Sequence, residues 1–469
     1  MTAWKRQGIV ALALAATACT TPNLEAPEAG IAVPEAWVET RAPPASLDLT
    51  EYWRLLDDPL LTEFVEAALA NNLDLAQSSA RLEQARAQLA GARAGYLPQV
   101  SASGRVQQDV LDNSADEPFI SLGADAGWEL DLFGRIGAGV AASEADLAAA
   151  GYSLSDLQRL IAGQVALATI SARATAMQLA IARDTLNYQD ENLQIARWRV
   201  QAGLVSSLDV EQARSQRAQT AATIPLLESN LAATANAIST LIGEPPGRVL
   251  ELLDAPAAIP APPEVAGFEA PAEVLRRRPD VRGAEAALVA NMARIDVARA
   301  QLLPGIQLGG TIGTSSLGLG SLFDVITGGV FGSISQLIFD GGRTQAQVDS
   351  ASAGAEGALA AWRLSILGAL EEVETAAVDL DRSGERVGIY AEALDAANNS
   401  AILARSQYEA GLTDFRNLLT SENQLLSARN AQVGAEADRA SAFVRLTQAL
   451  GGGWSPIDYP LPISDRTQP

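Results

Sequence analysis

The chain has 469 residues, no His, a single Cys and a formal net charge of −23 at pH 7. The lack of His excludes Ser-His-Asp triads and Cys/His metal sites, and a single Cys excludes an intrachain disulfide. The acidic balance argues against a nucleic-acid partner, because phosphate binding needs a basic face. It fits either simple solubility or a docking face for basic partners.

Residues 1–18 are predicted to be a secretory signal peptide, because a positively charged start precedes an apolar stretch too short to span a bilayer. Cys19 lies where a bacterial lipoprotein signal places its acceptor, so we expect a covalent lipid there, with no cofactor and no metal. Ordinary cleavage after the Ala-x-Ala sequence at 16–18 is the alternative. Because Thr20 follows in place of an Asp retention signal, the resemblance to bacterial lipoproteins implies the outer membrane. Residues 19–52 then form a lipidated N-terminal tail.

The rest of the chain repeats itself. Leu97-Pro98 recurs 206 residues later as Leu303-Pro304, and the sequences DLFGR and FDGGR end 208 residues apart. Such regular landmarks indicate an internal duplication. We predict a first repeat at 53–243, a linker at 244–271 that serves as a surface connector, a second repeat at 272–451 and a C-terminal tail at 452–469.

Within each repeat, the hydrophobic period becomes two after the Leu-Pro landmark, which predicts strands at about 99–132 and 305–340. The last of these strands, Val330–Phe339, is predicted from composition and not from alternation. From 119 to 132 one face is apolar, and the other carries Asp125, Glu129 and Asp131. Such strands fit either a soluble sheet half-covered by a core or a transmembrane barrel with the carboxylates in a wet lumen. Four strands are too few to close a barrel, so the second alternative requires several chains.

Helical spacing then predicts long helices at about 136–242 and 344–450, each pair reversing at a Gly-Leu sequence. At 1.5 Å per residue, the first helix of each pair would be on the order of 100 Å long. Gly203 and Gly411 supply the left-handed conformation that a reversal needs. Ser206, Ser207, Asp209 and Asp414 can cap the returning helices. An ordinary capped hairpin would need no more than this.

Five segments carry a resemblance to a known family, and they occur in the family's order. The chain resembles the TolC-like outer-membrane factors, in particular the NodT/OprM-type lipoprotein subunits of tripartite efflux systems. The segments are WELDLFGR at Trp128–Arg135, RRRPDVRGAEAAL at Arg276–Leu288, LIFDGGR at Leu337–Arg343, YEAGL at Tyr408–Leu412 and ALGGGW at Ala449–Trp454.

The resemblance implies an α plus membrane-β fold: a homotrimeric TolC-like channel with four strands per chain in a shared twelve-stranded barrel and a long periplasmic α-helical barrel. It implies a passive exit duct, not an enzyme, that exports drugs or other toxic small molecules. The duct would dock to a periplasmic adaptor (membrane fusion) protein and an inner-membrane pump, often of the resistance–nodulation–division type. A channel for protein secretion is the alternative, and the sequence does not identify the cargo.

The resemblance also assigns site residues. The adaptor-docking tips would be Val200, Gly203, Leu204, Tyr408, Gly411 and Leu412. A periplasmic gate would follow the second tip, where this chain has Arg416, Asn417 and Thr420 in place of the family's frequent Leu or Asp, with Asp414 and Glu422 as nearby acids. Spacing at i, i+3 and i+6 puts residues on one helix face, which motivates the hypothesis of a polar gate formed by Asp414, Arg416, Asn417 and Thr420.

Two more distant alternatives follow from the helices. One is a lipid-anchored coiled-coil spacer without a pore, against which the acidic strand face argues. The other is a secreted hydrolase that uses Glu371, Glu372 and Glu374, although a solvated or lumen-facing charge run is the simpler explanation.

Overall fold

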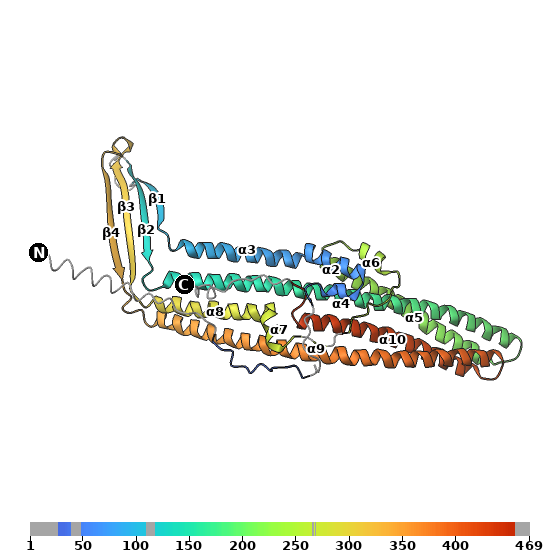
Figure 1. Ribbon diagram of the computed structural model, residues 1–469. Coiled ribbons are helices and arrows are strands. Elements are labelled where there is room, and N and C mark those ends of the chain that lie inside the picture. The colour runs from blue at the N-terminus through green and yellow to red at the C-terminus, as the bar shows by residue number, and fades with distance from the viewer. Residues whose placement is uncertain (1–26, 39–47, 109–117, 265–266, 268, 455–469) are drawn as a thin grey trace.

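The computed structural model describes residues 27–38, 48–108, 118–264, 267 and 269–454 (Figure 1). Cys19, the predicted signal peptide and residues 455–469 lie outside this part of the chain.

Each repeat builds the same series of elements, so the duplication predicted from the sequence is visible in the fold. The first repeat comprises η2 (Tyr52–Leu56), α2 (Pro59–Asn71), α3 (Leu73–Ala94), β1 (Gln99–Gln107), β2 (Phe119–Leu130), α4 (Arg135–Gln201) and α5 (Ser207–Leu241). After α6 (Arg248–Leu253), the second comprises α7 (Pro271–Arg277), α8 (Pro279–Ala300), β3 (Gly305–Leu317), η3 (Leu319–Ser321), β4 (Ile326–Ser335), α9 (Arg343–Glu409) and α10 (Phe415–Ala449). The long helices α4 and α9 have 67 residues each, and the return helices α5 and α10 have 35 each.

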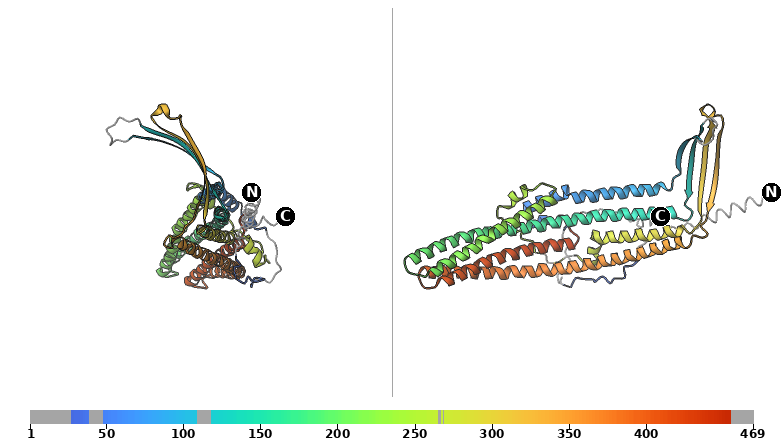
Figure 2. Two further views of the ribbon diagram at one scale, coloured as in Figure 1. Left: turned by 90° about the vertical axis from the view of Figure 1, so that its left-hand side faces the viewer. Right: turned by 180° about the vertical axis from the view of Figure 1, so that it is seen from behind.

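The molecule is elongated, with the sheet at one end and the two helical reversals at the other (Figure 1). In the half near the sheet, α4 packs against α3 and α8, and α8 packs against α9. In the half near the reversals, α4 packs against α5 and α10, and α10 packs against α9. Figure 2 shows from two further sides that these helices run side by side along the long axis.

The four strands form one antiparallel sheet in the order β1-β2-β3-β4. The second strand of the second repeat was predicted at Val330–Phe339 but lies at Ile326–Ser335. Ser335 pairs with Gly305, the first residue of β3, and Pro304 precedes that residue. No partner strand is therefore available to residues 336–339, and their apolar composition alone does not make them a strand.

The largest hydrophobic cluster lies where the short helices pack on α4, around mid-length of the molecule. Tyr52, Trp53 and Phe64 are buried there against α4 and α10. The linker was expected to be only a surface connector, and that expectation is wrong for α6. Val249 and Leu253 from α6 are fully buried in the same cluster, so apolar burial fixes this part of the linker on the bundle.

The described part of the N-terminal tail, residues 27–38, lies along α9. The Trp37 indole N–H donates to the Glu269 carbonyl at 2.7 Å, and Arg363 Nε donates to the Ala29 carbonyl at 2.7 Å. The backbone N–H of Val38 donates to the Glu374 carboxylate at 2.8 Å. One of the three carboxylates of the hydrolase alternative therefore holds the tail.

By length and composition, one described helix contains a stretch apolar enough to cross a membrane, and it is α4. Of that stretch, 56% is buried within the chain. Packing against α3, α8, α5 and α10 accounts for its apolar character.

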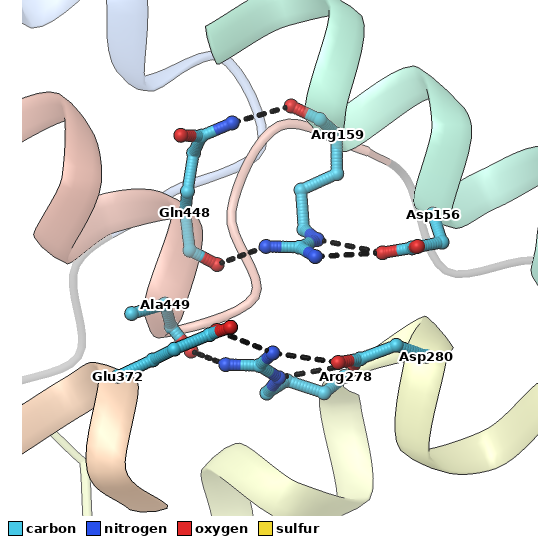
Figure 3. A network of polar contacts seen from close by, with 7 residues as sticks. All are labelled: Asp156, Arg159, Arg278, Asp280, Glu372, Gln448 and Ala449. Carbon is cyan, nitrogen blue, oxygen red and sulfur yellow. Dashed lines mark hydrogen bonds and ion pairs between the residues drawn. The ribbon is translucent and has the colours of Figure 1, made fainter. Parts of the chain in front are cut away.

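Two arginines donate hydrogen bonds to the carbonyl groups at the C-terminal end of α10 (Figure 3). Arg278 donates to the Ala449 carbonyl at 2.9 Å, and it also bonds Asp280 and Glu372, both at 2.6–2.7 Å. Arg159 donates to the Gln448 carbonyl at 3.1 Å. The last carbonyls of a helix lack intrahelical donors and carry partial negative charge, so arginines stabilise them. The RRRPD segment thus ties α7 and α8 to α10.

Arg278 and Asp280 each stabilise the charged form of the other. Arg278 is 1% exposed. Burial disfavours its charge, but Asp280 and Glu372 outweigh that effect and raise the pKa of Arg278. Burial would likewise raise the pKa of Asp280, but the hydrogen bond and charge of Arg278 outweigh it and hold that pKa below its ordinary value.

Asp280→Asn is predicted to lower the apparent unfolding temperature at neutral pH by a few degrees, because it leaves the buried Arg278 with one carboxylate fewer. In a chain of this length each kcal/mol corresponds to only about 1 °C. Because the folded-state pKa is lowered, the stability from Asp280 is present above about pH 4 and is lost as the pH falls through the lowered pKa. The deficit of the variant should therefore shrink below about pH 4.

Glu273→Gln is the matched control, because the Arg276–Glu273 pair is exposed on both sides. Exposed pairs contribute little, so this variant should unfold like the unaltered protein. Thermal unfolding across pH measures both. An equal deficit for Asp280→Asn at pH 7 and pH 3 would contradict the assignment.

Candidate functional site: a polar sheet face and two helical tips

The strand register puts polar residues on one face of the sheet. Asp125 pairs with Ser101 on β1 and Thr311 on β3, and Glu129 pairs with Gln307. Residues paired across strands share a face, and so do residues two apart along a strand. The opposite face is apolar and largely exposed within one chain, with Val330 at 89% and Ile334 at 74% exposure.

The three carboxylates predicted for a barrel lumen have different surroundings. Asp125 is exposed, and within the described chain no basic side chain pairs with it. Glu129 accepts two hydrogen bonds from Arg135, at 2.9 and 2.6 Å, and this bond raises the pKa of Arg135. Asp131 lies beyond the end of β2 and accepts from the backbone N–H groups of Ile136 and Gly137.

Asp131 therefore serves the start of α4. In the second repeat Asp340 has the same role, because it accepts from the backbone N–H groups of Gly342 and Thr344 at the start of α9. Those bonds and the Thr344 hydroxyl lower the pKa of Asp340. The DLFGR and FDGGR segments are thus strand-to-helix junctions. In each, a carboxylate accepts hydrogen bonds from backbone N–H groups that have no partner within the helix, and its negative charge stabilises the positive end of the helix dipole.

Both helical tips turn by the same backbone motif. Gly203 and Gly411 have φ of 71° and 73°. The N–H of Leu204 donates to the Arg199 carbonyl at 2.9 Å, and the N–H of Leu412 donates to the Gln407 carbonyl at 2.8 Å. These are Schellman motifs, which need a left-handed residue and therefore favour glycine. Of the four predicted capping residues, Ser206 and Asp414 accept from the backbone N–H groups of Leu208 and Asn417, whereas Ser207 and Asp209 lie inside α5.

The tip residues predicted to dock a partner differ in exposure. Leu204 is 72% exposed and Leu412 is 78% exposed. Val200 is half-buried, whereas Tyr408 is only 3% exposed and packs on Phe415 with ring centroids 5.3 Å apart. The side chain of Tyr408 is therefore part of a small core inside the tip, and the two leucines present apolar surface.

Arg199, which the sequence analysis did not single out, joins the two tips. Its guanidinium donates to the carbonyls of Tyr408 and Glu409, at 2.9 and 3.2 Å. It also lies over the Tyr408 ring, 4.2 Å from the centroid. An arginine near a helix C-terminus is a recognisable sequence signal. Its targets belong to the other repeat, however, and the sequence gives no contact between them.

A cluster of polar side chains joins α4, α9 and α10 between the tips and the middle of the bundle. Glu422 accepts from Asn192 at 2.7–2.8 Å and from Arg405 at 3.0 Å. Arg405 also lies 5.0 Å from the centroid of the Tyr188 ring. This cluster borders a cavity of about 310 Å³ between the same three helices. It fixes the position of α10 just after Thr420, the last of the predicted gate residues.

The four predicted gate residues share one exposed region at the start of α10. Asp414, Arg416, Asn417 and Thr420 are all exposed. The Thr420 hydroxyl donates to the Arg416 carbonyl at 2.9 Å, and Asn417 Nδ2 donates to the Thr413 hydroxyl at 3.0 Å. These bonds and the Asp414 cap are local, so the four side chains are not linked to one another within one chain.

Comparisons of sequence and of structure with known proteins both find similarity to outer-membrane efflux proteins and channels. The family model described as "Outer membrane efflux protein" matches residues 64–244 and 270–452. Nodulation protein T of Rhizobium leguminosarum bv. trifolii is 30% identical, over 87% of this chain and 88% of that protein. The pyoverdine export outer membrane protein OpmQ of Pseudomonas putida is 30% identical, over 95% of this chain and 97% of that protein.

Among solved structures, the outer-membrane channel OprN superposes with a TM-score of 0.81 at 32% identity, over 92% of this chain and all of that chain. The predicted TolC-like fold is confirmed.

Proposed function

Because the chain belongs to the family of outer membrane efflux proteins, we propose that three copies of it form a passive exit duct for an inner-membrane pump. The protein is an outer-membrane component of an efflux system, and it extends into the periplasm. The proposal adds the number of copies, the partners and the roles of single residues.

The observation that carries the proposal is the unfinished sheet. β1 and β4 are its edge strands, and each leaves a row of unpaired backbone groups. A membrane-spanning sheet must close, because no water is present to satisfy such groups in the bilayer core. Four strands cannot close, whereas three chains supply twelve strands, which lies within the range of outer-membrane barrels.

In such a barrel the apolar face meets lipid and the polar face lines the duct. Val330 and Ile334 on the first face are largely exposed in one chain, which fits contact with lipid. Asp125 and Glu129 on the other face would lie along the lumen. Asp131 would lie at its periplasmic end, because it caps α4.

The tips are proposed to dock a periplasmic adaptor protein, which connects the duct to an inner-membrane pump of the resistance–nodulation–division type. Leu204 and Leu412 support this assignment, since both are apolar and exposed at the end farthest from the sheet (Figure 1). Gly203 and Gly411 shape the turns, and Val200 and Tyr408 support them from within. Exposed apolar surface at a narrow end marks an interaction site.

The start of α10 is proposed to be the periplasmic gate. Asp414, Arg416, Asn417 and Thr420 are exposed there, and none is held by a side chain of another element. Three copies of this polar surface around an axis would form a charged constriction. Arg416 gives it a positive charge.

No catalytic residue and no cofactor form part of the proposal, because a duct moves its cargo without chemistry. The carboxylates of the hydrolase alternative have structural contacts: Glu372 pairs with Arg278, and Glu374 holds the N-terminal tail. The cargo is proposed to be a small molecule and not a secreted protein. A relative of nearly the same length, named for pyoverdine export, supports this choice.

Cys19 is proposed to carry the lipid that anchors the mature chain. Intact-mass measurement of the protein purified from membranes tests this. We expect a chain that begins at Cys19 and is heavier than its amino-acid sequence by an attached lipid. An unmodified mass would support ordinary cleavage instead.

A photoreactive residue at Leu204 or Leu412 is predicted to crosslink to the adaptor in cells, because both positions are exposed at the tip. Leu364 on α9 is the matched control, since it is a leucine of similar exposure, 70%, far from the tip. Mass spectrometry identifies the products. Adaptor crosslinks confined to Leu364 or to the helix ends near the sheet would show that the tips are misassigned.

Arg416→Ala and Thr420→Ala are predicted to increase the unitary conductance of the channel in planar bilayers, because each removes a side chain from the constriction. Arg416→Ala should also increase the preference for cations, since it removes a positive charge. Arg276→Ala is the control, as it removes an exposed arginine on α7, away from the tips. Unchanged conductance for both gate variants would rule out the polar gate.

A further inference from the structure

The aromatic side chain of Phe331 lies within the polar face of the sheet. Phe331 on β4 pairs with Gly309 on β3, and Gly309 pairs with Gly127 on β2. Gly329, two residues before Phe331, pairs with Thr311, which in turn pairs with Asp125. Phe331 therefore lies on the face that carries Asp125, among residues that are otherwise small or polar.

The ring of Phe331 covers a glycine and leaves its outer side free. A Cβ on Gly309 would overlap the ring, so the ring lies directly on the Gly309 backbone. Phe331 is nevertheless 53% exposed. A Cβ on Gly127 would meet nothing within 4 Å. The surface beside the ring is thus bare backbone with room above it.

An unpaired carboxylate lies next to this surface. Asp125 and Gly309 are diagonal neighbours on adjacent strands, a relation that places residues about 7–8 Å apart. Among the described residues, no basic side chain pairs with Asp125, whereas the nearby Glu129 is neutralised by Arg135. A ligand whose aromatic ring stacks on Phe331 and whose ammonium group pairs with Asp125 would span about this distance.

Cover of a glycine by an aromatic side chain also stabilises a sheet without any ligand. That role uses only the side of the ring that faces Gly309. It accounts neither for the open side of the ring nor for the glycine beside it.

We propose that Phe331, Gly127 and Asp125 form a binding site in the duct for organic cations that carry an aromatic ring. The ring of the cation stacks on Phe331 over the bare backbone of Gly127, and its charged nitrogen forms an ion pair with the Asp125 carboxylate. The inference rests on the proposed function, because the polar face must line a water-filled lumen.

The test uses a thiol introduced beside the ring. Thr311→Cys puts it on the polar face, opposite Asp125 and two residues from Gly309, and Ile312→Cys puts the matched thiol on the opposite face. Each variant is reconstituted in lipid as the full mature chain and labelled with a membrane-impermeant maleimide, and peptide mapping assigns the label. Benzyltrimethylammonium and tetramethylammonium are the probes, because they share the charge and differ in the ring.

The thiol at position 311 should react, and the thiol at 312 should not. Benzyltrimethylammonium should slow labelling at 311 about two- to tenfold more than tetramethylammonium, the factor that one aromatic stacking contact gives. Phe331→Tyr should retain this difference and Phe331→Ala should abolish it. Phe331→Leu keeps an apolar cover on Gly309 without an aromatic ring, so it should also abolish the difference in a stable sheet. Asp125→Asn should weaken protection by both cations.

Equal protection by both probes, or discrimination that survives in Phe331→Leu, would overturn the binding site while leaving the duct intact. Labelling at 312 but not at 311 would instead overturn the orientation of the sheet, and with it the proposed function.

Discussion

The structure depends on a sheet that one chain cannot complete. Among the described residues, the outer edges of β1 and β4 have no partner strand, and most of the apolar face is exposed. Water could hydrogen-bond the backbone groups of the edge strands, but exposure of the apolar face to water is unfavourable. Lipid would solvate the apolar face but leave those backbone groups without hydrogen bonds. Closure of a barrel from several copies pairs the edge strands and lets the apolar face contact lipid. The helices below must then also surround a common axis, because α4 and α9 continue directly from the strands.

The duplication explains why two different sequences make equivalent parts, and the differences between the repeats show where function was added. Both tips use the same glycine turn, and both long helices begin at a carboxylate cap. The polar contacts that join the repeats are not duplicated. Arg199 reaches the second tip, whereas the corresponding position in the second repeat is Gln407. The second tip is thereby held by the first, and the exposed start of α10 lies directly after it.

Much of the fold could be predicted because it rests on local patterns. Helical spacing without Pro predicted α4 and α9, and the period of two predicted β2 with its apolar and polar faces. The predicted position of β4 was wrong, because residues 336–339 are apolar but have no partner strand within the described chain. Strand pairing depends on segments far apart in the sequence and cannot be inferred from local composition. The packing of α6 was missed for the same reason: Val249 and Leu253 enter a core built from distant segments.

The site was predictable to the same limit. Glycine turns and caps can be recognised in the sequence, and the exposure of Leu204 and Leu412 follows from their place in such turns. The burial of Tyr408, its contact with Arg199 and the pairing of Phe331 with Gly309 depend on residues far apart in the chain. No periodicity reveals these contacts.

Native mass spectrometry of the purified protein, released from detergent micelles, tests most directly that several copies share one barrel. The account predicts one predominant species with the mass of three mature chains. A predominant monomer would contradict it, because a single chain would leave both sheet edges open within the membrane.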